Sequence, residues 1–376
     1  MNNINTNNNN LKLLQEICLT QNIPFVSYRL PLENDIITFI QHNSFPETID
    51  SLENIDAKKR FIFAPFTQTT VNQTYLLSPD ATFISNDIDD SFIKELSENK
   101  KFSTISKKEK ANISSTTASE FILNVNKAID TIKKGQLQKV VLSKVRVEKR
   151  RHNFKPESFF LDLCNKYPHA MVYLIQLPDI GCWIGATPEP LLQIENECVQ
   201  TVSLAGTQLA SKEKTAYQWS PKEIEEQGIV TDFVEQTLRS LEVKSLSKIG
   251  PVNYQAANLI HLKTSFEFPK TELNNKLGNF IQALHPTPSV GGMPKSKALN
   301  FILSNEKHDR AYYTGFLGPV NIDEKSAIFV NLRCLQLFEK QIVLYSGAGI
   351  TASSVAENEW EETENKIMTM MNVMTL

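Results

Sequence analysis

Two pairs of glutamates have a spacing that suits a metal site. Glu223 and Glu226 lie three residues apart, and Glu359 and Glu362 repeat that spacing near the C-terminus. Side chains three residues apart share one helix face, so each pair points at one spot. If the two faces meet, four carboxylates surround a volume that needs a cation, and Mg²⁺ prefers such hard oxygen ligands. Each pair alone has a plainer explanation, because acids near a helix start favour the helix dipole.

A lysine and a glutamate in the middle of the chain have the residue types of a general base and a general acid. Lys139 opens the segment KVVLSKVRVEK, where β alternation places its side chain on the face of Val141 and Ser143. Burial lowers the pKa of a lysine, which then acts as a base. Glu189, in GATPEPLL, acts as an acid if desolvation raises its pKa. The local sequence by itself favours a solvated lysine and an exposed turn glutamate.

Other segments are suited to binding an anion. Arg333 stands in the apolar segment FVNLRCLQL, which we interpret as a strand, and such an arginine usually pairs with a carboxylate of a ligand or of the protein. The segments LAGT (204–207) and SGAGI (346–350) place small residues after strands, where backbone N–H groups approach an anion. The GxG in the second is weak evidence for a nucleotide loop. The segment HPTPSVGGMPK (285–295) is typical of a rigid turn.

The elements that position these residues can be predicted in outline. A polar linker at 107–119 is followed by an amphipathic helix that continues to Gly135. A second helix begins at Ser220 and Pro221 with a capping box completed by Glu223, and the last helix begins after Ser354. Apolar, β-branched segments predict strands at 140–147, 171–177, 191–194, 199–204, 327–338 and 341–346. Long strands with intervening helices favour an α+β protein.

Composition limits the classes of partner. The 376 residues carry a net charge of -3, so no basic field attracts nucleic acid. No apolar run reaches the roughly 18 residues that span a bilayer, and the start of the chain lacks the pattern of a signal peptide, so we expect a cytoplasmic protein. The five cysteines have no metal-binding spacing. We expect residues 1–10, which are rich in Asn, to be disordered.

Ten segments, in order, resemble the chorismate-utilising enzymes, the family of isochorismate, salicylate, anthranilate and aminodeoxychorismate synthases. They are KVVLSK, GATPEPLL, SLAGT, KEIEEQGIV, HLKT, LHPTPSVGG, DRAYYTGFLG, NLRC, YSGAGI and ENEWEETENK. The resemblance implies a single α+β body, built on a large layered antiparallel β structure flanked by helices, with the site in a cleft between its halves. Residues 118–376 form the chorismate-binding catalytic region, and 11–117 form a weakly defined N-terminal part of the same body.

The resemblance also implies roles for residues. Glu226 and Glu362 match the Mg²⁺ ligands, with Glu223 and Glu359 as nearby or water-mediated partners, and the metal binds the ring carboxylate of chorismate. Lys139 matches the base that activates water, while Glu189 matches the acid that protonates the departing hydroxyl. Arg333 and Tyr313 pair with the enolpyruvyl carboxylate, helped by backbone amides near Gly347. Further pocket positions are matched by Gly206, Thr207, His261, Thr264, Ser289 and Lys366.

These matches lead us to expect an isomerase, an isochorismate synthase in which water adds at C2 of chorismate as hydroxyl leaves C4. Its product would serve menaquinone or siderophore synthesis. Relatives that add ammonia usually lack the lysine at 139 and need a glutaminase partner, so we expect no such partner and a monomer.

The chain departs from the family pattern at four positions. Ser289 stands between the Ala common in isochorismate synthases and the Thr of relatives that eliminate pyruvate or add an amine, which leaves a salicylate synthase as an alternative. Gln227, Lys263 and Lys144 replace a His, a small residue and an Arg. None of the four removes a catalytic group. A chorismate-binding protein without activity is the remaining alternative.

Overall fold

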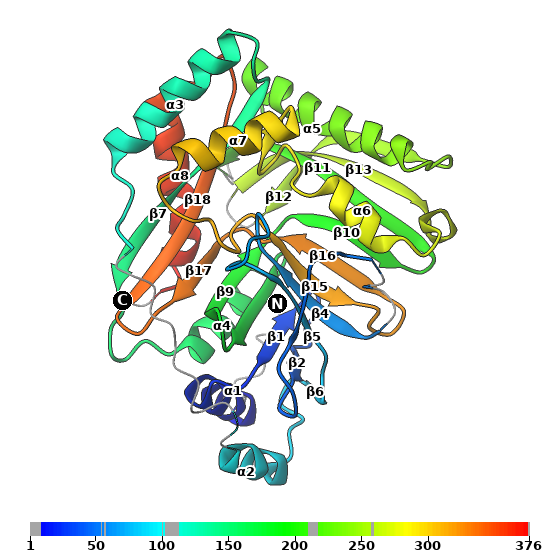
Figure 1. Ribbon diagram of the computed structural model, residues 1–376, viewed down its shortest axis with the longest axis vertical. Coiled ribbons are helices and arrows are strands. Elements are labelled where there is room, and N and C mark those ends of the chain that lie inside the picture. Colours follow the sequence, from blue (N-terminus) through cyan, green and yellow to red (C-terminus); the bar gives the residue numbers. More distant parts are fainter. Residues whose placement is uncertain are drawn as a thin grey trace.

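The computed structural model describes residues 9–53, 55, 58–99, 101, 113–209, 217–256 and 259–374. In these ranges the chain forms two antiparallel sheets of nine strands each, with eight α-helices against them (Figure 1). The predicted α+β class and layered antiparallel architecture are therefore confirmed. No helix in the described ranges has the length and hydrophobicity to cross a membrane.

Sheet A is the sheet that carries Lys139. Its strands, in spatial order, are β14 (Gly292–Met293), β7 (Lys139–Lys149), β18 (Gln341–Ile350), β17 (Cys334–Leu337), β9 (Gly181–Thr187), β8 (Met171–Leu177), β1 (Phe25–Arg29), β2 (Ile37–Ile40) and β6 (Ala81–Ile84).

Sheet B carries most of the other strands that border the predicted site. Its strands, in spatial order, are β12 (Ser247–Ala256), β13 (Leu259–Pro269), β11 (Cys198–Leu209), β10 (Pro190–Glu195), β16 (Ser326–Val330), β15 (Phe316–Val320), β4 (Arg60–Ala64), β5 (Thr74–Leu77) and β3 (Glu47–Ile49). The N-terminal third supplies β1, β2 and β6 to sheet A, and β3, β4 and β5 to sheet B.

The helices pack on the outer faces and ends of the two sheets (Figure 1). They are α1 (Asn9–Gln21), α2 (Asp90–Glu98), α3 (Ala118–Lys133), α4 (Pro156–Lys166), α5 (Pro221–Ser240), α6 (Leu277–Leu284), α7 (Lys295–Asn305) and α8 (Ala356–Met371), with a short 3₁₀ helix at Lys270–Leu273. Helix α5 contacts β11 and β13, whereas α8 contacts β18 and α3. The two glutamate pairs thus approach from different sheets.

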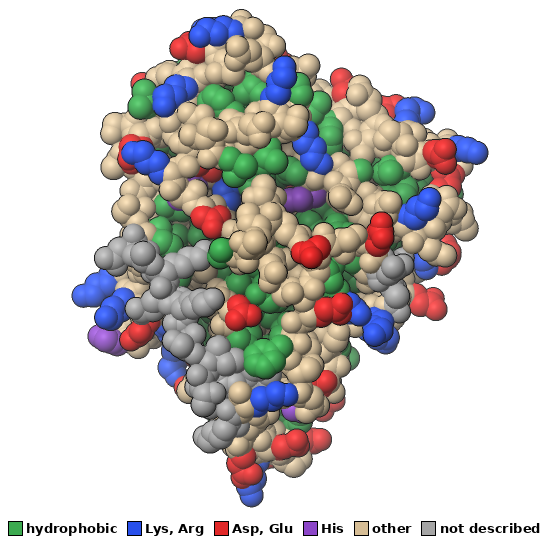
Figure 2. All heavy atoms as spheres, in the orientation of Figure 1, with side chains coloured by type: hydrophobic (Ala, Val, Ile, Leu, Met, Phe, Trp, Pro, Cys, Tyr) green, Lys and Arg blue, Asp and Glu red, His purple; other side chains and the backbone are tan. Residues whose placement is uncertain are grey.

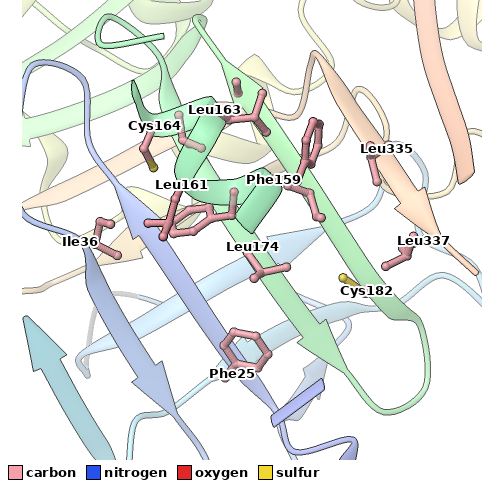
Figure 3. Packing of buried hydrophobic residues seen from close by; sticks show 14 of the residues in the cluster. Phe25, Ile36, Phe159, Leu161, Leu163, Cys164, Leu174, Cys182, Leu335 and Leu337 are labelled. Carbon is pink, nitrogen blue, oxygen red and sulfur yellow. The ribbon is translucent and has the colours of Figure 1, made fainter. Parts of the chain in front are cut away.

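Separate apolar clusters hold these layers together. Between the sheets, the ring of Phe63 from β4 stacks on Tyr312 at 4.4 Å and meets Trp183 from β9 at 6.2 Å. On the outer face of sheet A, Figure 3 shows side chains of α4, among them Leu163, against the strands that carry Leu174. Burial of such side chains contributes about 1.5–3 kcal/mol each. Both sheets are therefore fixed relative to each other by packing.

Charged side chains of both signs occur on one face of the molecule. On the face shown in Figure 2, Lys and Arg side chains alternate with Asp and Glu side chains, and no region of one sign dominates.

The three helices predicted from the sequence are confirmed. Ser220 caps α5 in a capping box with Glu223, and Pro221 is the first helical residue. A second capping box, formed by Thr117 and Glu120, begins α3. Helix α8 begins at Ala356, after the predicted serine pair. The two capping boxes satisfy backbone N–H groups that a helix start leaves without partners.

The strand predicted at 327–338 is wrong as one element. The chain leaves sheet B at the end of β16, turns through Arg333 with a left-handed φ of 48°, and enters sheet A as β17. Arg333 therefore lies in the crossing between the sheets and not within a strand. A continuous apolar run could not reveal this break, because both flanking strands are buried.

The small-residue segments also differ from the prediction. Gly206 lies inside β11, at an irregularity in its pairing with β13 and with a φ of 68°, and 346–350 form the end of β18. At the N-terminus, the prediction of disorder for 1–10 is wrong for Asn9 and Asn10, which begin α1, since the Asn10 amide donates to Ile88 O at 3.1 Å. Positions 1–8 and residues 107–112 of the predicted linker lie outside the described residues.

Candidate active site

The predicted base lies in a closed environment. Lys139 is fully buried, and its Nζ lies 2.8 Å from Oε1 of Glu226 on α5. The interpretation of Lys139 as a solvated lysine at a strand edge is therefore wrong. A buried ammonium without a carboxylate partner is strongly unfavourable, so Glu226 accounts for the position of this side chain.

A glycine makes room for this ion pair. A Cβ at Gly349 of β18 would lie 2.2 Å from Glu226 Oε1 and 3.1 Å from Lys139 Cε. Both distances are shorter than ordinary contacts, and φ at Gly349 is not in the left-handed region. Position 349 therefore requires glycine because a side chain would not fit there, and not because of its backbone conformation.

We expect Gly349→Ala to push the Glu226 carboxylate away from Lys139 and to lower kcat for the reaction proposed below by up to about 10²-fold. Gly228→Ala, in α5, is the matched control, because a Cβ there meets no atom within 4 Å. Steady-state kinetics of both variants check the prediction. Equal activity of the two variants would show that the contact at Gly349 is irrelevant to the reaction.

Glu189 has the environment of an acid that is protonated near neutral pH. It lies between β9 and β10, as predicted, but it is 6 % exposed, so the alternative of an exposed turn residue is wrong. Burial raises the pKa of Glu189 to about 7, against the opposing charges of Lys139, Arg333 and Lys366. Its carboxyl group is therefore close to three cationic side chains and is able to donate a proton.

The acids on the two helices face a common region, where lysines neutralise them. Lys222 Nζ lies 2.5 Å from Glu359 Oε1, and Lys366 Nζ lies 2.5 Å from Glu362 Oε1. Although burial lowers the pKa of Lys222, the carboxylates of Glu359, Glu362 and Glu226 raise it overall. Three of the four predicted metal ligands thus surround one ammonium group.

The carboxylates of these helices are the candidate ligands of a metal ion. In the described part of the chain, no three His, Cys, Asp or Glu side chains are close enough together to hold a metal ion. However, Glu359 is 2 % exposed and its Oε2 has no hydrogen-bond partner among the described residues. An unsatisfied buried carboxylate oxygen beside Glu362 and Glu226 fits a hard divalent cation.

Glu223 has a structural task. Its carboxylate accepts from the backbone N–H of Ser220 at 2.8 Å, and Gln208 Nε2 lies 3.3 Å from its Oε2. A metal role for Glu223 stays a prediction. The sequence did not indicate that Lys222 is a functional candidate. Neither its spacing nor its type distinguishes it from other lysines on helix surfaces.

Several predicted anion-binding groups converge next to Gly347. A Cβ there would lie 3.1 Å from the Tyr313 hydroxyl, and Gly347 O accepts from Lys366 Nζ at 2.9 Å. Arg333 is half-buried, and its charge acts on both Tyr313 and Glu189. The nearby acids are paired with lysines, so this guanidinium is available for a carboxylate ligand.

The predicted pocket positions on β11 and β13 are buried. His261 Nδ1 lies 2.8 Å from Gly206 O, and burial together with the charge of Arg333 lowers the pKa of His261 to about 3. The imidazole is therefore neutral and donates through Nδ1 to the carbonyl. Thr264 is fully buried and accepts from Gln227 Nε2 at 3.2 Å. The backbone of Thr207 lies in β11.

Three of the departures from the family pattern have structural partners. Gln227, which is 3 % exposed, also donates to Ser203 Oγ at 3.0 Å and so fastens α5 to β11. Lys144 lies on the opposite face of β7 from Lys139, pairs with Glu364, and has its Nζ 3.2 Å from the centroid of the Trp360 ring. Ser289 donates to Leu204 O at 2.8 Å.

A cavity of about 1020 Å³ occurs elsewhere, lined by residues of α1, the loop before α4 and the β8–β9 turn. None of the predicted site residues lines it. The site is therefore defined by the charged and buried groups described above and not by that cavity.

A buried lysine paired with an acid, a carboxyl group that titrates near neutrality and several cations together define an acid–base site between two antiparallel sheets. A family model described as "Chorismate binding enzyme" matches residues 38–375. The chain therefore belongs to the family of chorismate-binding enzymes.

The chain is similar to curated proteins of this family. It is 31 % identical to isochorismate synthase EntC of Escherichia coli K12 over 216 residues, which cover 56 % of this chain and 55 % of the relative. It is 31 % identical to isochorismate synthase DhbC of Bacillus subtilis over 202 residues, covering 51 % of this chain and 50 % of the relative. The matched regions thus span about half the length of these relatives. Anthranilate synthase component 1 of Aquifex aeolicus is 26 % identical over 279 residues, covering 70 % and 54 %.

Solved structures share the fold over nearly the whole chain. DhbC of Bacillus anthracis superimposes with a TM-score of 0.78 at 22 % identity, covering 97 % of this chain and 99 % of that one. MenF of Escherichia coli superimposes with a TM-score of 0.76 at 20 % identity, covering 96 % and 91 %. The predicted fold of the chorismate-utilising enzymes is therefore confirmed, including the N-terminal third that carries no recognisable motif.

Proposed function

We propose that the chain is a Mg²⁺-dependent isochorismate synthase. One observation carries the proposal: Lys139 and Glu189 are both buried and close enough for the lysine charge to act on the pKa of the carboxyl group. A base and an acid that act on one small ring must lie within reach of it together. The names of the relatives EntC and DhbC point to the same activity.

Each group has one proton to move. Lys139, once it has released its own proton, takes a proton from water, which then adds at C2 of chorismate. Glu189 gives its proton to the hydroxyl that leaves C4, because hydroxide itself is a poor leaving group. Both steps depend on exclusion of bulk water, and the burial of both side chains provides it.

The substrate carboxylates have separate partners. Arg333 and the Tyr313 hydroxyl bind the enolpyruvyl carboxylate beside the backbone of Gly347, since these groups converge there and the nearby acids are already paired. Glu226 and Glu362 would hold Mg²⁺ together with Glu359, whose second oxygen lacks a partner among the described residues. When bound, the ion supplies positive charge for the ring carboxylate.

The wider context follows from this assignment. Isochorismate is a precursor for menaquinone or for siderophores, and a cytoplasmic monomer without a glutaminase partner suffices for water addition. We propose that residues 11–117 belong to the same body as the catalytic region at 118–376, a division supported by the strands that the described part of 11–117 adds to both sheets.

The test is to incubate the purified protein with chorismate, with Mg²⁺ or with EDTA, and to separate the products by chromatography. We expect isochorismate in equilibrium with chorismate, loss of product in EDTA and recovery on addition of excess Mg²⁺. Glu362→Gln should need a higher Mg²⁺ concentration for half-maximal rate, because one charged ligand is lost. Formation of salicylate and pyruvate would instead favour a salicylate synthase, in which Ser289 permits elimination. No turnover under any condition would leave a chorismate-binding protein.

A further inference from the structure

A buried arginine ties together several segments around the proposed site. Arg310 is 3 % exposed and forms a two-pronged pair with Glu306, with Nη2 to Oε1 at 2.6 Å and Nε to Oε2 at 2.8 Å. The Glu306 side chain is also 3 % exposed. Arginine presents its donors in a rigid planar fork, so such a pair fixes direction as well as distance.

The remaining donors of Arg310 reach three other segments. Nη2 donates to Val141 O at 2.7 Å, and Nη1 donates to Val290 O at 2.9 Å and to Thr314 Oγ1 at 3.3 Å. All the acceptors are buried, so each bond is protected from competing water.

Each of these acceptors adjoins a residue of the proposed site. Val141 lies two residues from Lys139 on the same strand face, Val290 follows Ser289, and Thr314 follows Tyr313. Among the described residues, Arg310 donates to none of the proposed site side chains. Its guanidinium instead binds two backbone carbonyls and one hydroxyl that lie beside them in the sequence.

The partner acid extends the same attachment. Glu306 accepts from Ser143 N at 2.7 Å and from Ser143 Oγ at 2.9 Å. Strand β14 pairs with β7 at Val140 and Lys139, so the carboxylate takes the place of a neighbouring strand further along this edge. At Gly292 of β14 a Cβ would lie 2.3 Å from Lys139 O, which shows how closely the loop after Ser289 approaches β7.

We propose that the Arg310–Glu306 pair is a positioning unit that fixes the strand carrying Lys139 relative to the loop carrying Ser289, and thereby the base relative to the acid. The inference rests on the proposed isochorismate synthase activity. Ser289 lies close to the acid, because its side chain is among the groups that act on the pKa of Glu189, and its hydroxyl donates to Leu204 O. A small shift of either segment changes the distance across which two protons must move.

A second buried arginine serves as the matched control. Arg29 is 1 % exposed and donates to backbone carbonyls of Tyr167 at 2.7 Å and of Ala170 at 3.1 Å. None of its acceptors adjoins a predicted site residue. Replacement of Arg29 by Lys therefore reports what loss of a buried guanidinium does to stability alone.

The experiment compares the wild type, Arg310→Lys and Arg29→Lys by thermal unfolding and by steady-state kinetics with chorismate and Mg²⁺. We expect Arg310→Lys to lower kcat by at least about 10-fold with little change in KM, since misplacement affects the reaction more than binding. Arg29→Lys should lower the unfolding temperature while it keeps the wild-type kcat. In Arg310→Ala, guanidinium ion at millimolar concentration should restore part of kcat, and should not do so in Arg29→Ala.

Two results overturn the inference. A wild-type kcat in folded Arg310→Lys contradicts it, and so does a loss of activity that follows the unfolding temperature equally in both lysine variants. If the wild type makes no isochorismate, the proposed function itself fails and the inference fails with it, a result that the parallel wild-type assay separates from the first two.

Discussion

Lys139→Met is expected to lower kcat for chorismate by about 10²–10⁴-fold, the range that a general base contributes. Methionine fills a similar volume without an amine, so the strand should stay in place. The KM for chorismate should change much less, because the variant keeps the proposed carboxylate contacts with Arg333 and with the metal site. Initial rates measured over a range of chorismate concentrations separate the two effects.

The control for this variant is Lys144→Met. Lys144 is also buried and lies on the same strand, but it faces Trp360 and Glu364 on the opposite side of the sheet. Loss of that lysine should lower the unfolding temperature and leave kcat close to that of the wild type. A wild-type kcat in Lys139→Met would show that another group activates water.

Glu189→Gln should have an effect of similar size, about 10²–10⁴-fold on kcat, because the amide has no acidic proton to give to the leaving hydroxyl. The pH dependence is the more specific sign. Since burial raises the pKa of Glu189 to about 7, the protonated form is present below that pH and is lost as the pH rises through it. The wild-type kcat/KM should therefore fall above about pH 7.

The exposed Glu195, at the end of β10, provides the control. Glu195→Gln should keep both the rate and the decline above neutral pH. In Glu189→Gln the residual activity should lack that decline. A profile that is unchanged by Glu189→Gln, at any overall rate, would assign the titration to another group.

Local signals predicted the elements better than they predicted the environment of the site. The capping boxes at Ser220 and the apolar pattern before Gly135 involve neighbouring residues only, so they could be read from the sequence. The break at Arg333 could not, because it depends on which of the two sheets each flanking strand joins. Burial on both sides hides such a crossing in a uniform apolar pattern.

The burial of Lys139 and Glu189 was beyond local reasoning for a related reason. The partner of Lys139 is Glu226, 87 positions further along the chain by number, on a helix that packs against the other sheet. Only the motif resemblance indicated that these side chains share a site. The local patterns around each residue favoured an exposed position, and both were wrong.

The glutamate pairs show a third limit of prediction from the sequence. Their helical spacing was correct, but spacing does not say what neutralises the charges. In the structure Lys222 and Lys366 do so, and Glu223 is engaged in a helix cap. A cation that enters this region must displace at least one ammonium group from a carboxylate, so Mg²⁺ binding should be accompanied by rearrangement of these lysines.

The most direct test of the account is to run the reaction with chorismate and Mg²⁺ in H₂¹⁸O and to analyse the products by liquid chromatography and mass spectrometry. The account predicts isochorismate that carries one solvent-derived ¹⁸O atom at C2, formed by the wild type and not by Lys139→Met. Isochorismate without the isotope, or no isochorismate at all, would contradict the claim that the chain activates water for addition to chorismate.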